Sequence, residues 1–127
     1  MRAHAIYTSL RRRSEFTPVH QQGRRKGDAY LQVRVLPHSI APYVPSLVRL
    51  GIIVSKKFGS AVARNRFKRV IRAAIRALGP LLRPGWDILV LPRAAQTLTS
   101  REAEHSLQAL LCALGVLSDP VVEEEAG

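Results

Sequence analysis

Residues 55–76 read SKKFGSAVARNRFKRVIRAAIR, and they predict the longest helix of the chain. Ser60 is placed to cap a helix over residues 61–78, and Gly79 followed by Pro80 ends it. Wound at about 100° per residue, this helix divides into an apolar and a cationic sector. The apolar sector contains Ala63, Phe67, Val70, Ile71, Ala74 and Leu78. We therefore expect a helix that packs one whole face on a core.

The opposite sector of this helix is a strip of polar, mostly cationic side chains. Like charges four residues apart on a helix destabilise it by a few tenths of a kcal/mol per pair. No acidic residue occurs between Asp28 and Asp87 to relieve that repulsion. An ordinary solvated face mixes charges of both signs, so this face predicts a polyanionic partner. We call it the cationic strip, and its members are Arg64, Asn65, Lys68, Arg69, Arg72 and Arg76, with Arg66 at its margin.

The loop before the helix continues the same surface. Lys56 and Lys57 add two cations, and Gly59 leaves the backbone open beside them. The free N–H groups and the dipole of a helix N-terminus also favour phosphate. We expect the loop and the strip to form one phosphate-binding surface.

The charge of the whole chain supports nucleic acid as the partner. Its 127 residues include 20 Lys and Arg against 9 Asp and Glu, for a net charge of +11. The excess lies in residues 1–93, whereas residues 94–127 are acidic. Arginine, the commoner cation here, suits phosphate and bases better than lysine does. A membrane is not expected as a partner, because the basic segments lack large apolar residues that could insert into a bilayer. DNA is not expected either, because a helix that reads DNA is usually presented by a compact, dimeric helical scaffold.

Other features exclude several protein classes. The longest apolar run has six residues, Ala109–Leu114, which is too short to span a membrane. The N-terminus lacks the apolar run of a signal peptide, so we expect a cytoplasmic protein. A single cysteine excludes an internal disulfide, and four scattered histidines argue against a metal site. The sequence offers no paired carboxylates, Ser/His/Asp arrangement or phosphate-binding loop of a self-contained enzyme.

The remaining pattern predicts one α+β domain over residues 9–117, between an N-terminal extension (1–8) and a flexible acidic tail (118–127). Two adjacent strands, joined by the proline-rich loop 37–46, are expected to pair antiparallel. The expected elements are a helix at 9–22 capped by Ser9 and disturbed at Pro18, a basic turn at 24–27, strands at 29–36, 47–54 and 86–92, and a helix at 101–114 capped by Ser100.

The stretch SKKFGSAVARNRFKRVIR resembles the bacterial ribonuclease P protein component, in which a Lys-Lys-x-Gly loop leads into an Arg-Asn-Arg helix. The resemblance extends over residues 9–117. It includes residues 10–23, which are similar to the family's first helix, the Arg49-Leu50-Gly51 strand, and the strand at 85–93.

The resemblance implies a fold and a function. The fold would be a two-layer α/β sandwich with a small mixed sheet and a left-handed βαβ crossover, shared with a domain of one ribosomal protein. The protein would be the auxiliary subunit of a ribonucleoprotein endoribonuclease. The RNA of that enzyme holds Mg²⁺ and cleaves, while the protein binds no cofactor of its own. The protein would bind the catalytic RNA and the 5′ leader of precursor tRNA, and would not cleave alone.

The resemblance also assigns residues. RNA contacts are expected from the loop and the helix, and the charge of the domain adds the run at the first helix as a further candidate: Lys56, Lys57, Gly59, Arg64, Asn65, Arg66, Lys68, Arg69, Arg72, Arg76, Arg11, Arg12 and Arg13. The leader would lie in a cleft, where aromatic and arginine side chains stack on unpaired bases. The candidates for this cleft are Phe16, His20, Tyr30 and Arg34.

Three alternatives stay open at this point. A non-catalytic ribosomal or RNA-assembly protein of similar fold would share the charge. A self-contained nuclease would need carboxylates that the motifs do not reveal. A DNA-binding regulator fits less well, because a reading helix is usually presented by a compact, dimeric helical scaffold.

Overall fold

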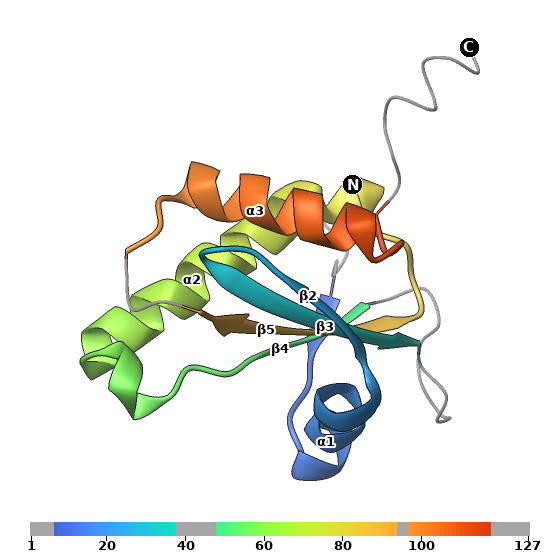
Figure 1. The fold of residues 1–127 in the computed structure, drawn as a ribbon, viewed down its shortest axis with the longest axis horizontal. Coiled ribbons are helices and arrows are strands. Elements are labelled where there is room, and N and C mark those ends of the chain that lie inside the picture. Colours follow the sequence, from blue (N-terminus) through green and yellow to red (C-terminus); the bar gives the residue numbers. More distant parts are fainter. Residues whose placement is uncertain (1–6, 38–47, 94–96, 118–127) are drawn as a thin grey trace.

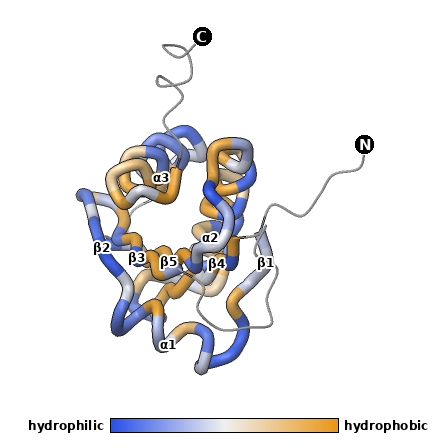
Figure 2. Tube along the Cα trace, turned by 90° about the vertical axis from the view of Figure 1, so that its right-hand side faces the viewer, coloured by the Kyte–Doolittle hydropathy of each residue, from blue (hydrophilic) through white to orange (hydrophobic). Residues whose placement is uncertain are grey.

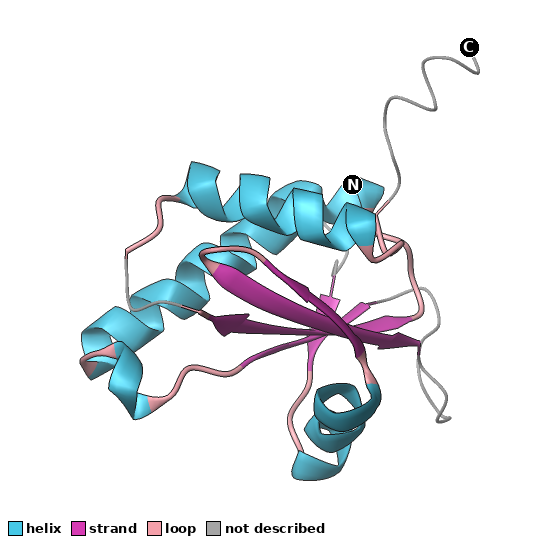
Figure 3. Ribbon diagram, viewed as in Figure 1, coloured by secondary structure: helices cyan, strands magenta, loops and turns pink. Residues whose placement is uncertain are grey.

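The computed structural model describes residues 7–37, 48–93 and 97–117 as a five-stranded sheet with helices on both faces (Figures 1 and 3). In this part of the chain no helix is long and apolar enough to cross a membrane. The strands are β1 (Tyr7–Ser9), β2 (Arg24–Gly27), β3 (Leu31–Pro37), β4 (Val48–Ile52) and β5 (Trp86–Pro92). The helices are α1 (Arg13–Gln22), α2 (Ala61–Leu78) and α3 (Ser100–Ala113), with 3-10 turns at Lys56–Phe58 and Gly79–Leu81.

Helix α2 confirms the prediction from its sequence. The Ser60 side chain accepts a hydrogen bond from the Ala63 amide at 3.1 Å and so caps its first turn. One face of α2 is buried, as the apolar sector predicts. That face and α3 cover one side of the sheet and form the main core with it (Figure 2). The buried residues of α2 are Phe67, Val70, Ile71, Ala74, Ile75 and Leu78.

The strand order β1-β4-β5-β3-β2 places β5 in the centre of the sheet. Strand β4 runs parallel to β5, and β3 runs antiparallel to it. The predicted direct pairing of strands 29–36 and 47–54 is therefore wrong, because β5 lies between them. The residues from Asp87 to Val90 are all buried, which explains why this later strand takes the central place. Helix α2 connects the parallel pair β4 and β5, as the resemblance implies, and the left hand of this crossover stays a prediction.

The predicted element ends need several corrections. Ser9 does not cap a helix but belongs to β1, which pairs with β4 and includes two residues of the expected extension. Helix α1 begins at Arg13 and continues through Pro18. Thr99, rather than Ser100, caps α3. The expected basic turn at 24–27 is β2, an edge strand along β3. Apart from Pro37, the predicted loop 37–46 lies outside the described residues, as does the tail 118–127.

Helix α1 lies on the face of the sheet opposite α2 and α3 (Figure 1). A small apolar cluster of Leu10, Val19 and Leu89 holds it there, and Phe16 packs against this cluster. Helices α2 and α3 thus cover one face of the sheet, and α1 covers the other. The β1 edge of the sheet lies between α1 and α2.

Candidate nucleic-acid interface

An open groove of about 590 Å³ lies at the β1 side of the sheet, with α1 on one side and α2 on the other. Strand β1 stops at Ser9, which pairs with Leu50, so β4 has no β1 partner beyond that point. We call this hollow the α1–α2 groove. It is lined by Tyr7, Ser9, Leu10, Arg11, Phe16, Leu50, Gly51, Ile52, Lys68 and Arg72.

The position of Phe16 in this groove depends on Gly51. A Cβ atom at Gly51 would lie 2.5 Å from Cε1 of Phe16 and 2.9 Å from Cδ1 of Leu10. The Phe16 ring therefore lies directly against the β4 backbone, an approach that only glycine permits. Phe16 is half-buried, and it lines the groove while it also packs on the sheet.

The groove combines aromatic rings with cations. Tyr7 and Phe16 supply two rings, and Arg11, Lys68 and Arg72 supply positive charge. None of its lining residues is acidic. Unpaired RNA needs both kinds of group, because rings stack on bases and cations follow the phosphates.

Sequence reasoning missed Tyr7, which fell in the expected extension. Its hydroxyl accepts a hydrogen bond from Nη1 of Arg76 at 3.3 Å, which ties β1 to α2. The run Ile6-Tyr7-Thr8, rich in residues that favour strands, is the signal that could have revealed it.

The cationic strip is open to solvent as predicted. Asn65, Arg69, Arg72 and Arg76 are exposed, and Lys68 is half-buried beside the groove. No residue of the strip forms an ion pair with a carboxylate in the described part of the chain. Arg64 donates from Nη1 to the carbonyl of Gly59 at 2.8 Å and so also holds the loop before α2. Lys56 and Lys57 are exposed on that loop.

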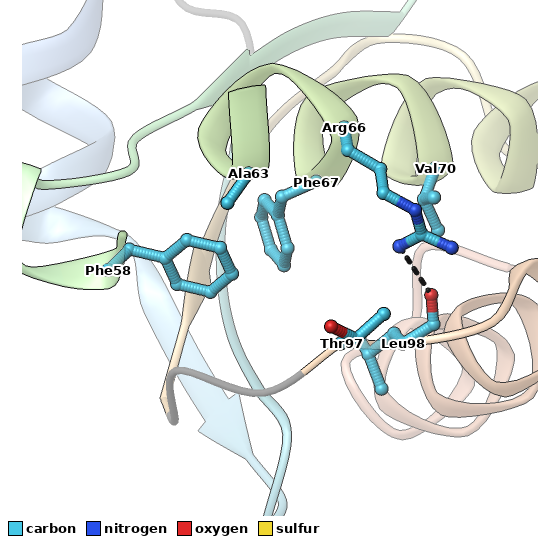
Figure 4. A pocket seen from close by; sticks show the side chains of 7 residues that line it. All are labelled: Phe58, Ala63, Arg66, Phe67, Val70, Thr97 and Leu98. Atoms are coloured by element: carbon cyan, nitrogen blue, oxygen red, sulfur yellow. Dashed lines mark hydrogen bonds between the residues drawn. The ribbon is translucent and has the colours of Figure 1, made fainter. Parts of the chain in front are cut away.

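Arg66 differs from the rest of the Arg-Asn-Arg run. Its Nη1 donates to the carbonyl of Leu98 at 3.1 Å, beside a small pocket that Phe58 and Phe67 also line (Figure 4). The two rings pack at 5.3 Å between centroids and 57° between planes. Arg66 therefore links α2 to the segment that leads into α3, although its side chain stays partly exposed.

Helix α1 is anchored to the sheet by a chain of charges that the sequence did not reveal. Arg49 on β4 makes two hydrogen bonds of 2.8 Å to the buried Asp87 on β5. The hydrogen bonds that Arg49 donates to the Asp87 carboxylate raise the pKa of Arg49. Arg49 also lies 3.6 Å from Glu15 at the start of α1. The Arg49–Asp87 contact depends on the β4–β5 register, which places the two residues opposite each other. No local sequence pattern encodes this register.

Glu15 also fixes the first turn of α1. It accepts hydrogen bonds from the backbone amides of Arg11 at 2.6 Å and Arg12 at 3.2 Å. These bonds, and less strongly the charge of Arg49, lower the pKa of Glu15. Arg11 precedes Glu15 and Phe16 follows it, so this turn sets the position of both side chains in the groove.

The other predicted cleft residues do not line the α1–α2 groove. His20 is exposed on α1, and its carbonyl accepts a hydrogen bond from Nη1 of Arg34. Nε and Nη2 of Arg34 also donate to Gln32. Tyr30 is 37% exposed in the turn between β2 and β3. Of the four predicted cleft residues, only Phe16 lines the α1–α2 groove. Arg12 and Arg13, which were predicted to contact RNA, are exposed at the start of α1.

Comparison with known proteins assigns this geometry to one family. A family model described as Ribonuclease P matches residues 7–115. The ribonuclease P protein component of Dehalococcoides mccartyi is 38% identical over 110 residues, which cover 86% of each chain. That of a Cyanothece species is 38% identical over 96 residues, 66% of this chain and 73% of the relative.

Solved structures agree with the same assignment. A Staphylococcus aureus RNase P protein mutant with defective mRNA degradation activity has a TM-score of 0.74 at 27% identity, over 86% of this chain and 89% of its own. The RNase P protein from Thermotoga maritima has a TM-score of 0.68 at 27% identity, over 80% of this chain and 92% of its own.

Proposed function

This chain belongs to the ribonuclease P protein family, and from that premise we propose that its α1–α2 groove binds the single-stranded 5′ leader of precursor tRNA. As a member, it is the RNA-binding auxiliary subunit of ribonuclease P, and it serves tRNA processing with the ribonuclease P RNA as its partner. None of the relatives named above is a ribosomal protein, so the comparisons give no support to that alternative.

The composition of the groove carries the proposal. Two rings, those of Tyr7 and Phe16, share a hollow with Lys68 and Arg72, and no carboxylate lines it. Stacking on aromatic rings contributes about 1–3 kcal/mol per base and accepts any base. A subunit that must accept leaders of many sequences needs this kind of contact rather than base-specific hydrogen bonds.

We assign the divalent ions of the reaction to the RNA. Within the described residues, no three His, Cys, Asp or Glu side chains are grouped to hold a metal ion. We propose that this chain holds the leader and screens its phosphates, while Mg²⁺ held by the RNA would supply the hydrolytic chemistry.

Leader length provides the test of the proposal. The holoenzyme is assembled with wild-type protein or with Phe16→Leu, which keeps an apolar side chain over Gly51 but removes the stacking face. Binding is measured for precursor tRNA with a long leader and for the same tRNA with a two-nucleotide leader. We expect Phe16→Leu to weaken only the long-leader complex, by about 1–3 kcal/mol for one stacked base. Phe58→Leu, which changes a ring outside the groove, is the matched control.

The charges of the groove give a second arm. Lys68→Gln with Arg72→Gln should reduce the slope of log affinity against log salt by about 1.4, or about 0.7 per single-stranded phosphate. Arg64 is left unchanged because it also holds the Gly59 carbonyl. Equal losses for the two leader lengths, or a slope like that of wild type, would disprove leader binding in this groove.

A further inference from the structure

The sheet carries a second group of exposed cations at the edge opposite the α1–α2 groove. All residues of β2 are exposed, and three of the four are Arg24, Arg25 and Lys26. Strand order puts β1 and β2 at opposite edges, so four strand spacings, or about 19 Å, separate them (Figure 2). We call Arg24, Arg25 and Lys26 the β2 edge.

The register shows how these cations are arranged. Arg24 and Lys26 are paired with Val35 and Val33, so they point to the face that carries α3. Arg25 is paired with Arg34 and points to the opposite face. The cations therefore lie on both sides of a free strand edge, whose outward amides are further donors for a phosphate oxygen.

No carboxylate neutralises the β2 edge among the residues that the structure describes. Arg24 donates from Nη1 to the carbonyl of Leu114 at 3.2 Å, and in the described part of the chain Arg25 and Lys26 have no ion pair. Arg25 and Arg34 are like charges directly opposite each other, an arrangement that destabilises a sheet. The nearby Asp28 does not compensate, since its oxygens accept hydrogen bonds from the Tyr30 and Leu31 amides and from Ser106.

We propose that the β2 edge is a second RNA-binding surface, which holds the phosphate backbone of a double-stranded segment of the ribonuclease P RNA. The inference rests on the proposed function in one respect. If the leader occupies the α1–α2 groove, the catalytic RNA must also be bound at a surface outside that groove. Strand β2 has cations but no aromatic side chain, unlike the groove. Paired bases are stacked inside a duplex and present phosphates outward, so a surface of cations alone suits a duplex.

A simpler explanation makes a different prediction. Proteins place charged residues on edge strands to prevent the pairing of two sheets. Charge reversal, Arg25→Glu with Lys26→Glu, preserves that protection because the edge stays charged. If edge protection is the only role, this variant stays monomeric and binds RNA as wild type does.

The experiment measures the affinity of the full chain for the ribonuclease P RNA over 50–400 mM monovalent salt. We expect Arg25→Glu with Lys26→Glu to reduce the slope of log affinity against log salt by about 1.4–1.8, as the loss of two phosphate contacts requires. The matched control is Arg83→Glu with Arg101→Glu, which makes the same change of net charge at two other exposed positions. The control should keep the wild-type slope. Size-exclusion chromatography and circular dichroism show that each variant is a folded monomer.

A second variant and a second probe complete the test. Arg25→Gln with Lys26→Gln removes the same two cations without adding acids, and it should reduce the slope equally if the reversed variant does not fold. Precursor tRNA without the catalytic RNA should bind the β2-edge variants with the wild-type slope, and the holoenzyme should keep its preference for long leaders. A wild-type slope with the ribonuclease P RNA, an equal reduction in the control, or an equal reduction with precursor tRNA alone would overturn the proposal while leaving the leader test untouched.

Discussion

The two faces of the central sheet are built differently. The face under α2 and α3 is apolar along β3, β4 and β5 and forms the main core there. The face under α1 combines a small apolar cluster with Arg34, Arg49 and Asp87, and its hold on α1 depends partly on Glu15. The difference shows that one face stabilises the fold while the other positions Phe16 and Arg11 at the groove.

The largest effect should come from the apolar face. Ile71 on α2 is fully buried, so Ile71→Ala leaves a cavity and should lower the free energy of unfolding by about 2–5 kcal/mol. Urea denaturation followed by circular dichroism measures it, and Ile71→Val should cost only about 0.5–1.5 kcal/mol. At temperatures where the variant is folded, its RNA-binding salt slope should match wild type. A changed slope would mean that the two faces are not separate in function.

A smaller effect is expected where the α1 face touches the groove. Gly51→Ala places a methyl group against the Phe16 ring and should destabilise the protein by about 1–3 kcal/mol. It should also weaken long-leader binding, because the ring must move. In a Phe16→Leu background the same substitution should cost less, since the shorter side chain can yield. Costs that simply add in the double mutant would show that Phe16 does not rest on Gly51 in solution.

The smallest effect concerns the first turn of α1. Glu15→Ala removes the acceptor for two backbone amides and should cost about 0.5–2 kcal/mol near neutral pH. Glu15→Gln keeps an acceptor and should lose less. The pKa of Glu15 is lower in the folded chain than its ordinary value of 4.5, so its contribution is complete above that pH.

As the pH falls through the lowered pKa of folded Glu15, this contribution is lost. The stability difference between wild type and Glu15→Ala should therefore be constant from pH 7 to about 5 and shrink at more acid pH. Thermal melts of both proteins across this range measure it. A difference that grows in acid would mean that Glu15 is not held as a carboxylate in the folded state.

The sequence predicted what local periodicity encodes. Helix α2 was predicted to its boundaries, its Ser60 cap is confirmed, and its buried face differs little from the apolar sector. The strand over residues 86–92 is also confirmed. These elements have long, regular patterns and strong end signals, so they depend little on the rest of the chain.

What the sequence could not predict depends on register and strand order. The Arg49–Asp87 contact joins residues that are 38 positions apart, and only the parallel pairing of β4 and β5 brings them together. The groove likewise needs β1, a three-residue strand whose sequence signal is confined to the short run Ile6-Tyr7-Thr8. Phe16 was assigned to the cleft through a family resemblance, whereas its neighbour Tyr7 had no such signal.

The central place of β5 also constrains how the chain can fold as it is synthesised. Strands β1 and β4 pair with each other, and so do β2 and β3, but only β5 joins the two pairs. A nascent chain that ends before Trp86 therefore holds two unconnected halves of a sheet, each with an open inner edge. Because Leu89 is the β5 partner of Gly51 and packs with Leu10, the part of the sheet beneath Phe16 is complete only after the ribosome has made the chain through Leu89. The chain can thus present a complete groove to RNA only after β5 has been made, when most of the cations in this sequence have already been synthesised.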